Sequence, residues 1–174
     1  MITKAFKNLL ACVLGSSGGS LSTGNLPAKN MGGNVRYLGF RNYFPGTVSQ
    51  NVTFSASSGI LVGTGNAAPT EDDYCLASQI TSGMSATSPA ATRSVDDNGN
   101  PYVEFVFVLS NTTGSDIVVS EIGYAQTLYC SSTEGSADSS TSTFLFDRTV
   151  LSTPVTVPAN GSAAVKYTMK TVIS

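Results

Sequence analysis

The stretch DDNGNPYVEFVFVLS, residues 96–110, constrains the fold more than any other part of the chain. Asp97-Asn98-Gly99-Asn100 has the residue types of a type I′ hairpin turn. After the turn, apolar side chains recur at every second position, at Val103, Phe105, Phe107 and Leu109. A period of two places these side chains on one face of a strand, and that face must be buried. The stretch therefore predicts a β-hairpin packed against a core.

Short apolar runs separated by Gly, Asn and Pro turns continue along most of the chain after residue 35. No long helix interrupts them, which excludes parallel βαβ units, and no repeat of 20–50 residues supports a solenoid. The sequence predicts an all-β fold, an antiparallel β-sandwich of jelly-roll or immunoglobulin-like type. Further strands are predicted at 35–40, 47–56, 59–65, 117–130 with a bulge at Gly123, 144–151, 154–158 and 162–172. The predicted core contains Val103, Phe105, Phe107, Val119, Ile122, Phe144, Val165 and Tyr167.

Residues 1–15, MITKAFKNLLACVLG, predict an amphipathic helix that Gly15 ends. The sequence LLAC at 9–12 resembles a lipoprotein cleavage site, but Lys7 and Asn8 leave the preceding apolar segment too short for a signal peptide. An isolated helix of about three turns is marginal in water, so it must pack on its own domain or on a neighbouring subunit. We expect it to serve as an assembly arm through Ile2, Phe6, Leu9, Leu10 and Val13.

This expectation divides the chain into three parts. Residues 1–15 are the helical arm, and residues 16–34, rich in Gly, Ser and Asn, are a flexible linker. Residues 35–174 are the β-sandwich domain.

Composition narrows the possible functions. Charged residues are only 11% of the chain, the net charge is −2, and no basic stripe exists, so nucleic-acid binding is not expected. No run of 18 apolar residues predicts a membrane span. The chain has no His, which removes the commonest general base and zinc ligand. We expect no catalytic residue, metal site or cofactor.

The three cysteines, Cys12, Cys75 and Cys130, are widely spaced and form no C-x-x-C motif. A Cys75–Cys130 disulfide is one possibility, and reduced, buried thiols are the favoured one.

Two acidic stretches could be mistaken for active or metal sites. In the first, Thr70 and Asp73 have capping-box spacing, and Glu71 and Asp72 then fall in the first turn of a single helical turn. A carboxylate pair for glycoside hydrolysis is the alternative, but adjacent acids point in different directions. The second stretch, 96–100, resembles a calcium loop, yet an EF-hand loop starting there would need Glu at its twelfth position. Phe107 stands at that position, so a hairpin turn is the better interpretation.

The pair Asp147–Arg148 lies inside the apolar strand FLFDRTVL. Neighbours on a strand face opposite sides, so the two side chains cannot pair with each other and each needs its own partner. Glu121, in the middle of the strand VSEIGY, is the predicted partner of Arg148, with backbone carbonyls as the fallback. We interpret this pair as a structural contact between strands and not as part of an active site.

Three stretches, in this order, resemble a group of small virion proteins of tailed bacteriophages. They are ILVGTGNAAPTEDDYCL, SNTTGSDIVVSEIGY and FLFDRTVLSTPVTVPANGSAAVKYTM. Their shared pattern is G-T-G-x-x-A-P-T-x-x-D-Y-x-L, then S-E-I-G, then D-R-x-V-L-x-T-P-V-T-V-P. The resemblance covers about residues 60–173, and the start MITKAFKNLL fits the group as well. It implies a structural role in a virus particle, and it carries over no catalytic residues.

These observations lead to an expected function and one alternative. We expect a non-enzymatic subunit of a bacteriophage virion, made in the host bacterial cytoplasm, that decorates the head exterior as a fibre or surface module or lies at the neck or tail. Its expected partners are other capsid, neck or tail proteins and further copies of itself. The alternative is a secreted or surface adhesive, carbohydrate-binding β-sandwich, which would need exposed aromatic side chains. The chain contains no Trp, and its seven Tyr fall mostly in strand patterns.

Overall fold

The computed structural model describes residues 1–15, 26–38, 51–133 and 140–170, with residues 11–15 described by their backbone alone. The elements are α1 (Lys4–Gly15), β1 (Leu26–Lys29), β2 (Val35–Leu38), β3 (Gly59–Gly63), β4 (Met84–Ala86), β5 (Ala90–Val95), β6 (Pro101–Asn111), β7 (Ile117–Ser131), β8 (Ser140–Val157) and β9 (Ser162–Lys170). Within these residues no helix is both long enough and apolar enough to cross a membrane.

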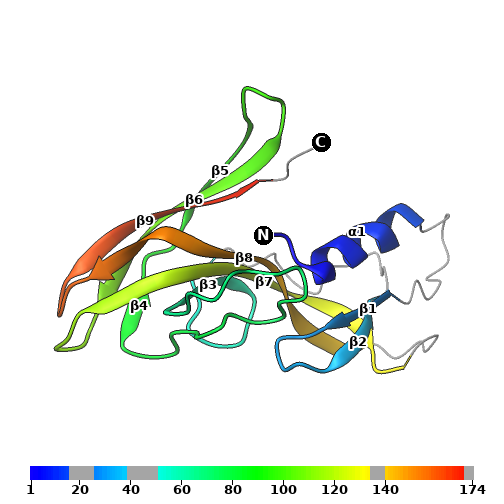
Figure 1. Cartoon of the computed structure of the whole chain (residues 1–174), viewed down its shortest axis with the longest axis horizontal. Coiled ribbons are helices and arrows are strands. Elements are labelled where there is room, and N and C mark those ends of the chain that lie inside the picture. The colour runs from blue at the N-terminus through cyan, green and yellow to red at the C-terminus, as the bar shows by residue number, and fades with distance from the viewer. Residues whose placement is uncertain (16–25, 39–50, 134–139, 171–174) are drawn as a thin grey trace.

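The strands form two antiparallel sheets that pack face to face, so the predicted β-sandwich is confirmed (Figure 1). In the first sheet, β7 pairs with β8 along one edge and with β3 and β2 along the other, and β1 extends β2. In the second sheet, β6 is central, with β9 on one side and β5 and β4 on the other. The two long central strands thus organise the molecule.

The β5–β6 hairpin is present as predicted, but its turn is of a different type. Asp96 donates its backbone N–H to the carbonyl of Asn100 at 3.0 Å, which leaves three residues in the loop. Among these, Gly99 has a left-handed φ of 78°, and no other residue of the loop has a positive φ. A type I′ turn requires positive φ at two central residues, so this is a three-residue loop that ends in a left-handed glycine.

The β7–β8 ladder contains two register shifts, one between Val119 and Glu121 and one between Tyr124 and Ala125. The second shift flanks the predicted bulge site Gly123, where the pairing itself is regular, and it leaves Phe146 of β8 as the extra residue. The two strands predicted at 144–151 and 154–158 form one continuous strand. Pro154 lies between the paired residues Val150 and Val155, at the register shift near Val119, where a proline removes no ladder hydrogen bond.

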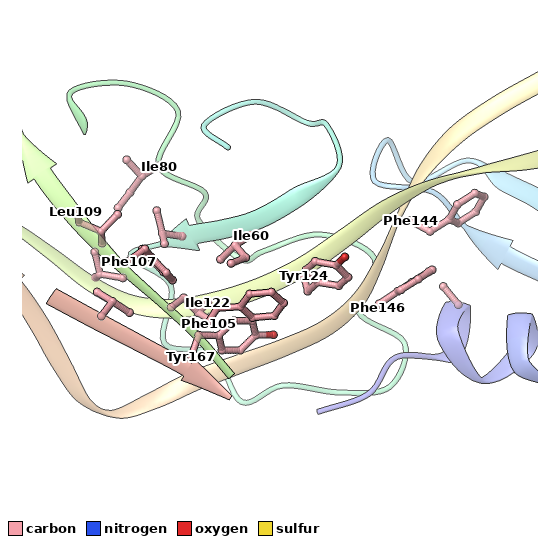
Figure 2. Packing of buried hydrophobic residues seen from close by; sticks show 14 of the residues in the cluster. Ile60, Ile80, Phe105, Phe107, Leu109, Ile122, Tyr124, Phe144, Phe146 and Tyr167 are labelled. Atoms are coloured by element: carbon pink, nitrogen blue, oxygen red, sulfur yellow. The ribbon is translucent and has the colours of Figure 1, made fainter. Parts of the chain in front are cut away.

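The main core lies between the sheets and contains the predicted residues (Figure 2). Phe105 stacks on both Tyr124 and Tyr167, with ring centroids 6.0 and 6.1 Å apart. Of the predicted core residues only Val103, on β6, is partly exposed, and it packs against the core from its margin. The buried members of the prediction are Phe105, Phe107, Val119, Ile122, Phe144, Val165 and Tyr167.

A smaller core lies on the outer face of the first sheet. Leu61 and Ala125 of the sheet meet Leu76 of the long loop 64–80, and Leu145 completes the cluster. The loop therefore covers a sheet face that would otherwise meet water. Residues 70–73 of this loop form a turn and not the predicted helical turn.

Two sequence-based predictions about organisation are wrong. Residues 26–29, predicted as linker, form β1, which pairs with β2, so the sandwich begins before residue 35. The sequence did not indicate β1, because a strand of four residues that contains Pro27 can form only at the edge of a sheet. The predicted strand at 47–56 is reduced, within the described residues 51–56, to a single bridge from Val52 to Ile60. Residues 16–25 lie outside the described residues.

α1 packs on its own domain, which is one of the two places that the sequence left open, and its role as an assembly arm stays a prediction. Leu9 is buried, and Phe6 meets Phe146 edge to face with centroids 5.4 Å apart. Ile2 forms a bridge to Asp147 of β8, which places the start of the chain beside the sheet. Leu10 alone among the described arm residues is largely exposed, and the side chain of Val13 lies outside the described residues. An amphipathic face must be buried, and here the domain itself buries it.

Candidate functional site

The predicted pair between Glu121 and Arg148 is present beneath the loop 64–80. Arg148 donates from Nε to Glu121 Oε2 at 2.8 Å, and both side chains are buried. Arg148 of β8 lies opposite Gly123 of β7, two residues from Glu121, so its long side chain reaches the carboxylate diagonally across the ladder. A Cβ on Gly123 would lie 2.9 Å from Leu76 Cδ2 and 2.9 Å from the carbonyl oxygen of Asp147, so a glycine here lets the loop pack closely on the strand.

The Glu121 carboxylate is saturated by hydrogen bonds from the loop. Oε1 accepts the backbone N–H groups of Ser78 at 2.7 Å and Gly65 at 3.1 Å. Oε2 accepts the N–H of Ala77 at 3.1 Å in addition to Arg148. A buried carboxylate is tolerated when its acceptor sites are filled in this way. Glu121 thus fastens both ends of the loop to the sheet.

Arg148 makes two more contacts: one with a carboxylate that the sequence did not indicate, and one with a backbone carbonyl, the kind of partner expected as a fallback. Nη1 donates to Asp73 Oδ2 at 2.8 Å and Nη2 to the carbonyl of Ala67 at 3.0 Å. Burial by itself lowers the pKa of Arg148, but the hydrogen bonds with Asp73 and Glu121 outweigh it and raise the pKa above its usual value. The guanidinium is therefore a fixed positive charge between two carboxylates.

Asp73 is held in place by its own turn. Thr70 donates its backbone N–H and its hydroxyl to the two Asp73 oxygens, each at 2.9 Å. Burial raises the pKa of Asp73, and the hydrogen bonds from Thr70 and Arg148 more than reverse this, so the pKa lies below its ordinary value of 3.8. The Thr70–Asp73 spacing predicts a structural role, and the structure agrees. The element that it forms is a turn that holds the Asp73 carboxylate against Arg148.

Asp147 faces the other side of the sheet, as strand geometry predicts, and lies in the main core. Its Oδ2 accepts the Tyr167 hydroxyl at 2.6 Å, and its Oδ1 lies 2.9 Å from the amino group of Met1. Burial, followed by the negative charge of Asp147, raises the pKa of Tyr167 well above 10. Asp147 therefore ties β8 to β9 and to the start of the chain.

Two glycines allow the backbone to approach the Glu121 carboxylate. A Cβ on Gly63 would lie 2.6 Å from Glu121 Oε1 and 2.5 Å from the carbonyl of Ser78, and one on Gly65 would collide with the same carboxylate oxygen. Only a residue without a side chain fits at either position. The two glycines of the G-T-G element are thus explained by their close contact with the Glu121 carboxylate.

The other acidic residues in the described part of the chain do not converge on a shared point. Glu71 and Asp72 are exposed and pair with Lys7 and Lys4 of α1. Asp96 accepts hydrogen bonds from its own turn and pairs with Lys170. Within the described part of the chain no group of three His, Cys, Asp or Glu side chains is placed to hold a metal ion. Cys75 and Cys130 are free thiols.

An open groove of about 360 Å³ lies beside this network, between α1, β1 and the turn 71–74. The buried residues Ala5 and Ala28 line it together with Tyr74, and the Lys29 ammonium lies 5.3 Å from the Tyr74 ring centroid. Arg148 does not line this groove. Its partner Asp73 does, so the charged network reaches the groove through this carboxylate.

Comparison with known proteins finds no matching family model, no similar curated protein and no similar solved structure. The role of the network consequently rests on its geometry. Its residues lie in the three sequence stretches described above: Gly63, Gly65 and Asp73 in the first, Glu121 in the second and Arg148 in the third. Stretches far apart in sequence thus meet at one buried ionic network.

Proposed function

We propose that the chain is a non-enzymatic structural subunit of a bacteriophage virion. It is made in the host bacterial cytoplasm and joins the particle as an accessory module on the head exterior or at the neck or tail. It acts by protein–protein assembly, with copies of itself and with other virion proteins.

The observation that carries this proposal concerns two charged residues of these sequence stretches, Glu121 and Arg148. Both side chains are buried, and their hydrogen bonds are made with groups of the same chain. A general acid or base must come within hydrogen-bond reach of a substrate, and these groups lie under a loop. Their effect is to hold that loop rigidly on a sheet, which suits a building block of an assembly.

The test is the composition of purified particles. Phage particles banded on a density gradient should contain the chain in a fixed ratio to the major capsid protein by quantitative mass spectrometry. Cryo-electron microscopy should then place a two-sheet density of this shape outside the shell or on the tail. An abundant host cytoplasmic protein serves as the contamination control. Loss of the chain together with that control during banding would contradict the proposal.

One observation favours the alternative, a surface or secreted carbohydrate-binding sandwich. The groove beside α1 has an aromatic wall at Tyr74 with Asn8 and Asp72 nearby, a combination that can hold a sugar. Lys29 lies near that ring, so the sugar would have to use its remaining surface. A glycan array read with the natural chain and with Tyr74→Ala distinguishes the two functions. Binding that Tyr74→Ala removes would favour the alternative.

A further inference from the structure

The second sheet extends beyond the sheet that covers it. At the covered end of its inner face, Phe105 and Tyr167 are buried, whereas Val103 and Met169 farther along are only partly buried. Val95, at the end of β5, is 62% exposed. Figure 1 shows the β5–β6 hairpin projecting away from the rest of the molecule. An apolar strip therefore runs out of the core onto an open surface.

This strip forms one wall of a groove of about 350 Å³. Val103 and Met169 of this strip line the groove, and Ile2 and Phe6 from the start of the chain line it as well. The charged residues that line the groove are both cations, Arg93 and Lys170. Lys170 pairs with Asp96, whereas exposed Arg93 forms no ion pair with any described residue. The groove thus combines an apolar surface with one uncompensated positive charge.

The groove continues into a free sheet edge. Within the described residues β5 pairs only with β6. The hydrogen bond from Asp96 to Asn100 fixes the alternation of the ladder, so Ala91, Arg93 and Val95 direct their N–H and C=O groups away from β6. Among the residues that commonly protect such edges, β5 contains no Pro and one charged residue, Arg93. An incoming strand would find unpaired backbone groups there.

We propose that β5 and this groove bind an extended segment of another protein, which adds to the sheet as an antiparallel strand. Its inward side chains are apolar, with one carboxylate opposite Arg93. Backbone hydrogen bonds along β5 give the affinity, and the apolar contacts and the Arg93 charge select the sequence. The proposed function does not require this site, and the site does not require that function.

Charge favours a different protein over a second copy of this chain. Two β5 strands related by a two-fold axis keep the most ladder pairs when the axis passes through Thr92 or Arg93. Residues directly or diagonally opposite lie about 4.5–8 Å apart, so the two Arg93 side chains would be close in either arrangement. Like charges in such positions destabilise the pairing.

The probe is the synthetic peptide acetyl-Thr-Val-Thr-Asp-Thr-Val-Thr-amide, titrated to millimolar concentration into the ¹⁵N-labelled full chain. Its valines and aspartate share one face, with the aspartate opposite Arg93. We expect saturable NMR shifts of the Ala91, Arg93 and Val95 amides. A peptide with lysine replacing the aspartate should bind at least about tenfold more weakly, because it places like charges together.

Two protein variants complete the test. Val95→Lys should abolish binding, while Val106→Lys, on the opposite face of the same sheet and 46% exposed, should leave it unchanged. Equal binding of the aspartate and lysine peptides, shifts away from β5, or no shift at millimolar peptide would each overturn the proposal. So would sedimentation that shows self-association of the natural chain lost in Val95→Lys, since the occupant would then be a second copy.

Discussion

At the scale of single residues, the contact between Glu121 and Arg148 should carry a measurable coupling energy. Removing one partner of a buried ion pair leaves an uncompensated charge, so Glu121→Gln and Arg148→Met should each cost about 3–5 kcal/mol in urea unfolding. The double variant should lose less than the sum, with a coupling between about 0.5 and 3 kcal/mol.

The chain supplies a surface pair as a control for this cycle. Lys166 and Glu104 lie at the same 2.8 Å separation, but the lysine is exposed to solvent. Water screens such a pair, so its coupling should be clearly weaker than that of the buried pair. Equal coupling in the two cycles would mean that burial adds nothing to the Glu121 contact.

The glycines around Glu121 give a second prediction at this scale. Gly65→Ala should destabilise the chain by about 1–3 kcal/mol, because its Cβ would collide with the Glu121 carboxylate. Gly114→Ala is the matched control, since a Cβ there meets no atom within 4 Å. Chemical denaturation of both variants checks the difference. A Gly65→Ala protein as stable as Gly114→Ala would contradict the tight approach of the loop.

Tyr167 makes the stability depend on alkaline pH. Burial and the Asp147 charge hold its folded pKa well above the ordinary value of 10.0, so the unfolded state releases this proton first. The contribution is complete below pH 10 and is lost as the pH rises toward the folded pKa. Unfolding free energies measured from pH 8 to pH 11.5 should therefore fall above pH 10. Tyr167→Phe should show a smaller fall, and an unchanged fall would assign it to other tyrosines.

At the scale of elements, α1 should behave as part of the core. Leu9 is 9% exposed and its neighbour Leu10 is 49% exposed. Leu9→Ala should cost about 2–5 kcal/mol, while Leu10→Ala should change the stability by no more than about 0.5 kcal/mol. The two substitutions alter the helix propensity equally, so thermal or urea unfolding isolates the packing. Equal effects of the two substitutions would contradict the packing of α1 on its own domain.

The elements differ in how far the sequence determines them. The alternation from Val103 to Leu109 predicts β6 correctly, because apolar side chains with a period of two share one face only in a β-strand. The helical spacing predicts α1 but not what covers it, since the same apolar face can meet its own sheet or another subunit. β1 could not be predicted, because four residues among Gly, Ser and Asn become a strand only when β2 offers its edge.

The same distinction applies to the ionic network. The Glu121 partner of Arg148 could be predicted, because a strand-borne arginine in an apolar run needs a carboxylate. The contact with Asp73 could not, since it depends on how the loop 64–80 folds over the sheet. The G-T-G glycines carried a usable signal, because paired glycines after a buried strand indicate a close approach of the backbone.

At the scale of the whole molecule, the network joins parts that are far apart in sequence. Asp73 and Glu121 fix the loop 64–80 on the sheet, while Glu71 and Asp72 of the same loop pair with α1. On the other face, Asp147 ties β8 to β9 and to the start of the chain. The loop, the helix and both sheets are thus expected to unfold together, as one cooperative unit.

Hydrogen exchange tests this cooperativity at three loop amides. Gly65, Ala77 and Ser78 lie outside the strands, yet their N–H groups bond to a buried carboxylate, so they should exchange only through global unfolding. The amide of Gly114, in the exposed bend between β6 and β7, is the fast-exchanging reference. Glu121→Gln should raise exchange at the three amides more than at the β6 amides, because it loosens the loop before the sheet. If the three amides exchange as fast as Gly114 in the natural chain, the loop opens independently and the network does not unite the molecule.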